Sequence, residues 1–206
     1  MATEPLELRL EEVSKRFGRQ WVIRQVSAAY RSGTTYGIRG RNGSGKSTLL
    51  RLLAGQLSPS RGRITYTLGG RSLPVQQVYT QVSWTGPYLE LVEELSVEEL
   101  LQFHFGLKPL QAGLDVGEVL ERVDLTSFRR RTLLDCSSGM RQRVLLATGL
   151  YAATPLLLLD EPTLTLDRTA ADWFYGELST YGAGRLVIVA SNDERDLAVC
   201  TQTMTL

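Results

Sequence analysis

The sequence predicts an α/β fold in which a parallel sheet is covered by helices on both faces. Residues 156–159 and 186–190 are short strands that are apolar on both faces, as in a sheet covered from both sides. A glycine-rich turn joins another short strand, residues 35–39, to a helix that starts near Lys46. Between residues 88 and 152 the pattern is mostly helical. We therefore expect an α/β core that is interrupted by a helical insertion.

The first third of the chain predicts a β layer of a different kind. Residues 6–13 alternate between apolar and charged side chains, which is typical of a half-buried strand. Residues 22–30 have the pattern of a second strand, and residues 63–67 follow a turn as a third. Together they predict an antiparallel β layer at the N-terminal edge of the core.

The helical insertion is expected to contain three helices, with a fourth helix beyond it. Ser96 and Glu99 form a capping box ahead of an apolar stripe, which places the start of the first helix. Residues 114–123 and 138–151 are the other two, and a helix around 170–178 separates the apolar strands.

The length of the chain is suited to one domain. Its 206 residues, 43% of them hydrophobic, are enough for one compact core with at most a subsidiary lobe. We expect a single domain over 1–206, with its core at about 1–87 and 153–206 and the helical subdomain at about 88–152.

Charge and cysteine content exclude several classes of protein. Lys and Arg number 23 against 22 Asp and Glu, so the chain as a whole has no strong positive charge that would attract nucleic acid. No nucleic-acid partner is expected. Cys136 and Cys200 lie far apart and fit no metal spacing, which favours a reduced, cytosolic protein. No apolar run is long enough to span a bilayer, and the N-terminus has no signal-peptide pattern. A role at a membrane therefore requires a partner that brings the chain there.

The glycine-rich turn matches a phosphate-binding loop, G-x-x-x-x-G-K-[ST], between a strand and a helix. Glycines let successive backbone N–H groups turn around phosphates, and the helix N-terminus adds partial positive charge. Lys46 would reach the β- and γ-phosphates, and the Ser47 hydroxyl would ligate Mg²⁺. The expected nucleotide-binding residues are Gly40, Arg41, Asn42, Gly43, Ser44, Gly45, Lys46, Ser47 and Thr48.

Two acids end the apolar strand at residues 156–159. At the carboxyl end of a parallel strand, Asp160 would face the same crevice as the phosphate loop and hold Mg²⁺, directly or through water. Glu161 would act as the general base that polarises the attacking water. Alone, the two acids are equally compatible with a solvated strand end, and the phosphate loop favours the metal and base roles.

One further segment points to a family. Residues 136–144, Cys-Ser-Ser-Gly-Met-Arg-Gln-Arg-Val, resemble the signature of ATP-binding-cassette (ABC) ATPases. Residues 161–167 resemble the stretch of that family through its D-loop, with Asp167, and Phe17 lies where its adenine-stacking aromatic lies. The resemblance covers essentially the whole chain and implies a P-loop NTPase (RecA-like) core, with ATP and Mg²⁺ as cofactors.

The same resemblance implies a head-to-tail dimer in which two ATP molecules lie between subunits. The signature residues that meet the partner's nucleotide would be Ser137, Ser138, Gly139 and Met140. Ser137 and the Gly139 backbone would cap the γ-phosphate in trans, while Ser138 would also N-cap its helix. The partner would be a second copy or another ABC ATPase subunit, and separate transmembrane permease subunits would dock at residues 87–95.

Two positions depart from the family in ways that affect turnover. The Q-loop glutamine position falls near Pro87-Tyr88, and Asn192 replaces the switch histidine. His104 is expected to be a packed or half-exposed helix residue, so it does not substitute. Asn192 can still donate a hydrogen bond to the γ-phosphate, and we expect slow but real hydrolysis. The signature itself departs at Cys136, Ser138 and Met140, where the family has Leu, Gly and Gln.

The function implied is an ATP-hydrolysing subunit of an ABC membrane transporter, located at the cytoplasmic face of the membrane. Its short length and the region Trp84-Thr-Gly86 resemble the ATPase subunit of heme exporters. The alternative is a soluble ABC ATPase of DNA repair or translation, although those usually carry two cassettes or coiled-coil insertions. A small-molecule kinase would leave residues 136–144 unexplained. Neither the cargo nor the direction of transport follows from this sequence.

Overall fold

A computed structural model describes residues 4–87 and 89–206, so Tyr88, at the expected Q-loop position, lies outside the described residues. The chain forms two compact units. One, here called the sheet unit, contains the described residues up to Trp84 together with 154–161 and 184–206. The other, the helical unit, contains 85–153 and 162–183. The expected division placed residues 162–183 with the core, whereas their contacts group them with the helical residues.

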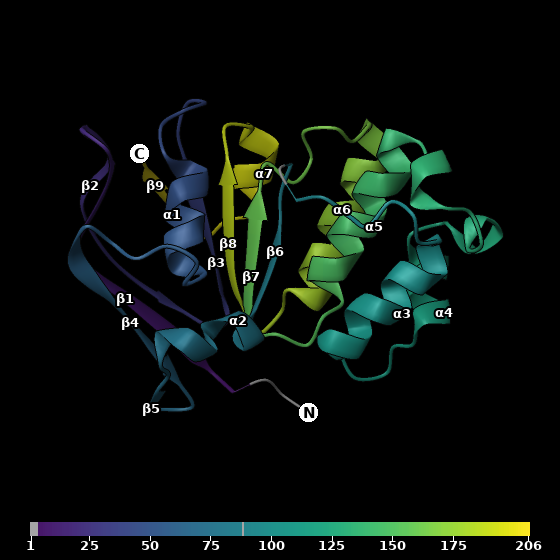
Figure 1. The fold of residues 1–206 in the computed structure, drawn as a ribbon, viewed down its shortest axis with the longest axis horizontal. Coiled ribbons are helices and arrows are strands. Elements are labelled where there is room, and N and C mark those ends of the chain that lie inside the picture. Colours follow the sequence, from purple (N-terminus) through teal and green to yellow (C-terminus); the bar gives the residue numbers. More distant parts are fainter. Residues whose placement is uncertain (1–3, 88) are drawn as a thin grey trace. The chain divides into compact units, whose positions relative to one another are not determined.

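The sheet unit contains the antiparallel layer that the N-terminal pattern predicted (Figure 1). The alternating residues Leu6, Leu8 and Leu10 are each 1% exposed, which buries one face of the layer and explains the alternation. The strands run in the order β2-β1-β4-β5, and their bounds are β1 Leu6–Phe17, β2 Gln20–Arg31, β4 Arg61–Leu68 and β5 Arg71–Ser72.

A second sheet of five strands follows the order β6-β7-β8-β3-β9, and the pairs β7-β8, β8-β3 and β3-β9 are parallel as expected. The sequence pattern did not predict β6 and β9. Both are only four residues long and contain polar side chains, so they lack the continuous apolar run of a buried central strand. The bounds are β3 Thr34–Arg39, β6 Val82–Thr85, β7 Leu156–Asp160, β8 Leu186–Ser191 and β9 Gln202–Thr205.

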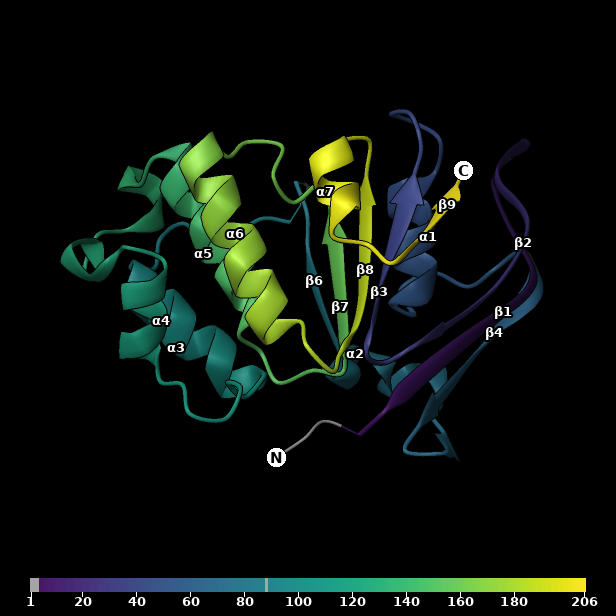
Figure 2. The ribbon, with the colours of Figure 1, turned by 180° about the vertical axis from the view of Figure 1, so that it is seen from behind.

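Helices cover the two faces of this five-stranded sheet. Helix α1, Lys46–Leu53, packs against β7 and β8, and its leucines at 49, 50, 52 and 53 are fully buried. Helix α7, Glu194–Ala198, packs on β3 and β8 from the opposite face, as the two opposed views show (Figures 1 and 2). A 3₁₀ turn, Val75–Gln77, leads into the short helix α2, Val78–Gln81. The arrangement confirms a parallel sheet with helices on both faces.

The helical unit contains the predicted helices, with α5 packed against α3 and α6. The expected capping box is present: the Ser96 hydroxyl accepts from the Glu99 N–H, and the Glu99 carboxylate accepts from the Ser96 N–H at 2.9 Å. A second capping box, Asp115 with Glu118, starts α4. The bounds are α3 Val97–Leu107, α4 Val116–Arg122, α5 Ser138–Leu150 and α6 Arg168–Tyr181, with 3₁₀ turns at Thr126–Phe128 and Leu133–Asp135.

One expectation about α5 was wrong. The N-cap is Ser137, whose hydroxyl accepts from the Met140 N–H at 3.2 Å, and Ser138 is already the first residue of the helix. Ser137 has the extended backbone of an N-cap (φ −63°, ψ 160°), which brings its hydroxyl over the first turn. His104 is packed as expected: its Nε2 lies 3.1 Å from the Thr148 carbonyl oxygen, and burial lowers its pKa.

Candidate active site

The phosphate loop lies between β3 and α1, as the motif requires. Gly43 and Gly45 have φ values of 82° and 107°, a backbone region that side-chain-bearing residues rarely adopt. A β-carbon on Gly45 would also lie 2.9 Å from the side chains of Val22 and Ile23. Gly45 occupies the N-cap of α1 and supplies no side-chain cap, so the first N–H groups of the helix face the loop without a side-chain acceptor. This turn can therefore bind an anion through backbone groups.

Lys46 is held at the base of the loop. Its side chain is only 6% exposed, and its Nζ donates to the Gly40 carbonyl oxygen at 2.8 Å. The same Nζ lies 2.9 Å from Oε1 of Glu161. A nearly buried ammonium thus joins the loop to the acid at the end of β7.

Glu161 has a strained backbone at the strand end. Its φ of 46° is uncommon for a residue with a side chain, and its N–H donates to the Ala190 carbonyl oxygen at 2.8 Å. The second carboxylate oxygen, Oε2, accepts from the Ser191 hydroxyl at 2.9 Å and lies 3.4 Å from the backbone nitrogen of Asn192. With 13% of its side chain exposed, the carboxylate is held from both sides.

Asp160 is more deeply buried, at 2% exposure. Burial raises its pKa, and a side-chain hydrogen bond with Ser47 opposes that rise. Among the described residues, its Oδ1 has no hydrogen-bond partner. An unpartnered carboxylate oxygen beside a hydroxyl suits a hard cation that takes oxygen ligands. The part of the chain that the structure describes has no cluster of three or more His, Cys, Asp or Glu that could hold a metal, so a cation here would need oxygens from a bound phosphate as well.

Asn192 follows β8 and lies between the loop and the acid. Its Nδ2 lies 3.4 Å from Oδ1 of Asn42, and its backbone nitrogen faces Glu161. Its side chain is exposed and carries the donor that the sequence analysis expected. Residues that were predicted from three separate segments are therefore close together in the sheet unit.

The remaining predicted residues occupy other places. Phe17 ends β1 and is 49% exposed, with the Lys15 Nζ 5.3 Å from the centre of its ring. Ser137, Gly139 and their neighbours lie at the start of α5 in the helical unit. Asp167 caps α6, where its Oδ1 accepts from the Ala170 N–H at 2.8 Å.

The sequence analysis missed two residues near Glu161: Ser191, which contacts its carboxylate, and Asp196, which contacts Ser191. The hydroxyl of Ser191 lies 2.8 Å from Oδ2 of Asp196, and both side chains are essentially buried, at 0% and 1%. The only signals in the sequence were a polar residue ending an apolar strand and an acid in the helix after it.

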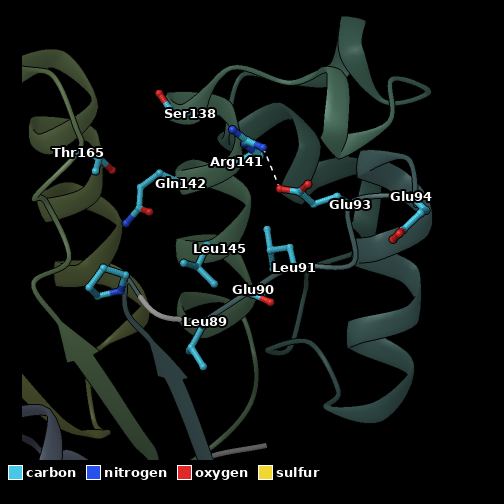
Figure 3. A pocket seen from close by; sticks show the side chains of 11 residues that line it. Leu89, Glu90, Leu91, Glu93, Glu94, Ser138, Arg141, Gln142, Leu145 and Thr165 are labelled. Carbon is cyan, nitrogen blue, oxygen red and sulfur yellow. Dashed lines mark hydrogen bonds and ion pairs between the residues drawn. The ribbon is translucent and has the colours of Figure 1, made fainter.

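A pocket of about 640 Å³ lies within the helical unit (Figure 3). The segment 89–94 lines one side and the first turns of α5 the other, and Glu93 and Arg141 form an ion pair of 2.8 Å across it. The segment coincides with the stretch that the sequence analysis expected to meet a membrane subunit. None of the helices in the described residues is both long enough and apolar enough to cross a membrane.

Comparisons with known proteins show the family to which the chain is similar. The profile of the ABC transporter family matches residues 23–164. The chain is 32% identical over 188 residues to the daunorubicin resistance ATP-binding protein DrrA3 of Streptomyces coeruleorubidus, covering 88% of this chain and 59% of that protein. It is also 32% identical over 191 residues to the cytochrome c biogenesis ATP-binding export protein CcmA of Rhizobium meliloti, covering 91% of each.

Solved structures support the fold. An ABC transporter ATP-binding protein from Pyrococcus furiosus superposes with a TM-score of 0.80 over 97% of both chains, at 22% identity. The chain spans only part of some relatives, including 48% of a sulfate/thiosulfate import protein, CysA of Thermosynechococcus vestitus, that is 37% identical over 162 residues. The family profile covers more than half of the chain, and DrrA3 and CcmA are each 32% identical to it, over 188 and 191 residues. The chain therefore belongs to the ABC transporter family, as its phosphate loop and signature segment predicted.

Proposed function

We propose that this chain hydrolyses ATP to drive transport by separate membrane subunits. The observation that carries the proposal is the ion pair of Lys46 with Glu161, whose Nζ and Oε1 atoms lie 2.9 Å apart at the base of the phosphate loop. It puts a phosphate-binding cation and a carboxylate base at one place. That pairing of groups is what phosphoryl transfer to water requires.

In this proposal the loop binds the nucleotide before chemistry begins. Backbone N–H groups around Gly43 and Gly45 surround the phosphates, and Lys46 turns from Glu161 to the β- and γ-phosphates. Ser47 and Asp160 hold Mg²⁺, which would neutralise charge on the phosphates. Phe17 is exposed enough to stack on the adenine.

Glu161 then acts on the attacking water. Once Lys46 contacts the phosphates, Oε1 of Glu161 is free to accept a proton from a water aligned with the γ-phosphorus. Asn192 donates a hydrogen bond to a γ-phosphate oxygen from its place beside Asn42. An amide cannot exchange a proton as an imidazole does, and residues 87–88 supply no glutamine, so we propose that turnover is slow.

A second subunit completes the site. Its Ser137 hydroxyl and Gly139 backbone would meet the γ-phosphate, with the N-terminus of α5 aimed at the charge. That subunit is a second copy of this chain or another ABC ATPase. Asp167, which fixes the start of α6, would lie at the same interface.

The pocket of the helical unit is the proposed contact for a membrane subunit. Leu89, Leu91 and Leu145 give it an apolar floor, and the Glu93–Arg141 pair crosses its rim, a combination suited to an amphipathic helix (Figure 3). The chain would then lie at the cytoplasmic face of the membrane. CcmA, whose name describes a cytochrome c biogenesis ATP-binding export protein, aligns with 91% of this chain, which supports a role in transport.

The test is co-purification of the tagged chain with membrane proteins from its own cells, followed by ATPase assay of the purified complex in liposomes. Leu91→Asp should abolish co-purification and the stimulation of ATPase activity. Leu107→Asp is the matched control, because Leu107 is 70% exposed on α3 and does not line the pocket. If both variants lose co-purification to the same extent, or if neither variant loses it, the docking pocket is rejected. Absence of ATPase activity from the intact complex would reject the proposed function.

A further inference from the structure

The hydroxyl of Ser191 lies between two carboxylates. It is 2.9 Å from Oε2 of Glu161 and 2.8 Å from Oδ2 of Asp196, and it accepts the Asp193 N–H at 3.0 Å. The residue ends β8 and is completely buried. A serine hydroxyl has one proton, so it can donate fully to only one of the two carboxylates at a time.

The two oxygens of Glu161 have different surroundings. Oε1 faces the Lys46 ammonium at 2.9 Å, and Oε2 faces the Ser191 hydroxyl and the Asn192 nitrogen. The Lys46 ammonium also donates to the Gly40 carbonyl oxygen. Because this ammonium is positively charged, bound phosphates would attract it away from Glu161. When Lys46 leaves, Oε1 loses its cation, and the contacts at Oε2 are what remain to orient the carboxylate.

We infer that Ser191 is a positioning residue for the base, and this inference rests on the proposed function. With Lys46 on the phosphates, Ser191 donates its proton to Oε2 of Glu161 and holds the carboxylate with Oε1 toward the attacking water. Asp196 is the alternative acceptor when Lys46 neutralises Glu161. The backbone of Glu161, at a φ of 46°, already restricts the direction of the side chain, and the hydroxyl fixes its remaining rotation.

The test compares variants in single-turnover and steady-state ATPase assays of the complex with its membrane subunits. Ser191→Ala should lower kcat about ten- to hundredfold, the usual effect of losing a hydrogen bond to a charged group, and leave the KM for ATP within about twofold. Ser191→Cys keeps the shape with a weaker donor and should also slow turnover. Ser83→Ala is the matched control: Ser83 is 2% exposed in the same sheet, and its hydroxyl bonds to Thr154. It should keep the parental kcat.

A double-mutant cycle with Glu161→Gln separates positioning from a structural role. If Ser191 acts through the carboxylate, Ser191→Ala should add no further loss of kcat in the Glu161→Gln background. A parental kcat in both Ser191 variants, or an equal fold loss in both backgrounds, would overturn the inference and leave the proposed function standing. A parental kcat in Glu161→Gln itself would instead reject Glu161 as the base, and the positioning role with it.

Discussion

The Nζ of Lys46 lies 2.9 Å from Oε1 of Glu161, so the expected phosphate lysine and the expected base are ion-paired. Both side chains are largely shielded from water, at 6% and 13% exposure, which strengthens their attraction. Phosphates bound in the loop must compete with Glu161 for this ammonium. We therefore propose that the pair couples nucleotide binding to release of the base.

Replacing Lys46 with Ala should weaken ATP binding by about a hundredfold, because the phosphates lose the nearly buried ammonium at the start of α1 and charge-assisted contacts are strong. Isothermal titration calorimetry with Mg²⁺ measures the affinity. Lys108→Ala removes the same side chain from the helical unit and is the control. Parental affinity in Lys46→Ala would reject the phosphate-loop assignment.

Replacing Glu161 with Gln should slow hydrolysis by about 10²–10⁴, the usual contribution of a positioned base. The amide no longer holds Lys46 by charge, so ATP should bind at least as tightly as to the parental chain. ATP should also trap the dimer, which gel filtration with Mg²⁺ would detect. Glu194→Gln removes an exposed acid paired with Arg39 and should change neither property. Monomers together with parental turnover in Glu161→Gln would contradict the assignment.

Asn192 should act as a neutral hydrogen-bond donor to the γ-phosphate. Asn192→Ala should lower turnover in the assembled complex, because the donor is lost outright, by up to about 10²-fold. Asn192→His should preserve or raise turnover, because a charge-assisted donor is stronger. ATPase rates of the three proteins decide the matter. Parental turnover in Asn192→Ala would show that the position is idle.

Asp160 should make stability depend on pH. Burial raises its pKa, so the folded chain binds this proton more tightly than the unfolded chain does. The ionisation of Asp160 therefore does not destabilise the folded chain at low pH. Its unfavourable contribution to the free energy of folding grows as pH rises from about 3.9, the ordinary pKa of Asp, through the raised pKa of the folded chain. Asp160→Asn removes this contribution and should raise Tm at pH 8 more than at pH 4.

Thermal unfolding at the two pH values measures the effect, with about 2–4 °C expected for each kcal/mol of stabilisation. Asp172→Asn, at an exposed position of α6, is the control. The Asp160 variant should also lose Mg²⁺-dependent hydrolysis, since an amide is a poorer ligand for a hard cation. An equal rise in Tm at both pH values would contradict the burial argument.

The sequence by itself determined the parts of this protein that depend on local pattern. The glycine turn, the Ser96–Glu99 capping box and the apolar strands β7 and β8 are each set by residues a few positions apart. These features can be predicted without knowing the rest of the chain, because backbone freedom, capping and burial periodicity act over one turn or one strand. The phosphate loop and the acids after β7 were found in this way.

Only the tertiary structure decided which of these segments meet. The register that pairs Arg39 with Ser191 and Asp160 with Ala190 brings the ends of β3, β7 and β8 together. That register places the Ser191 hydroxyl on Glu161, and the turn into α7 adds Asp196. It depends on strand order, which is set by packing of the whole sheet and by no local pattern. The edge strands β6 and β9 escaped prediction for the same reason: each has only four residues that mix polar and apolar side chains, so its place comes from pairing with a neighbour.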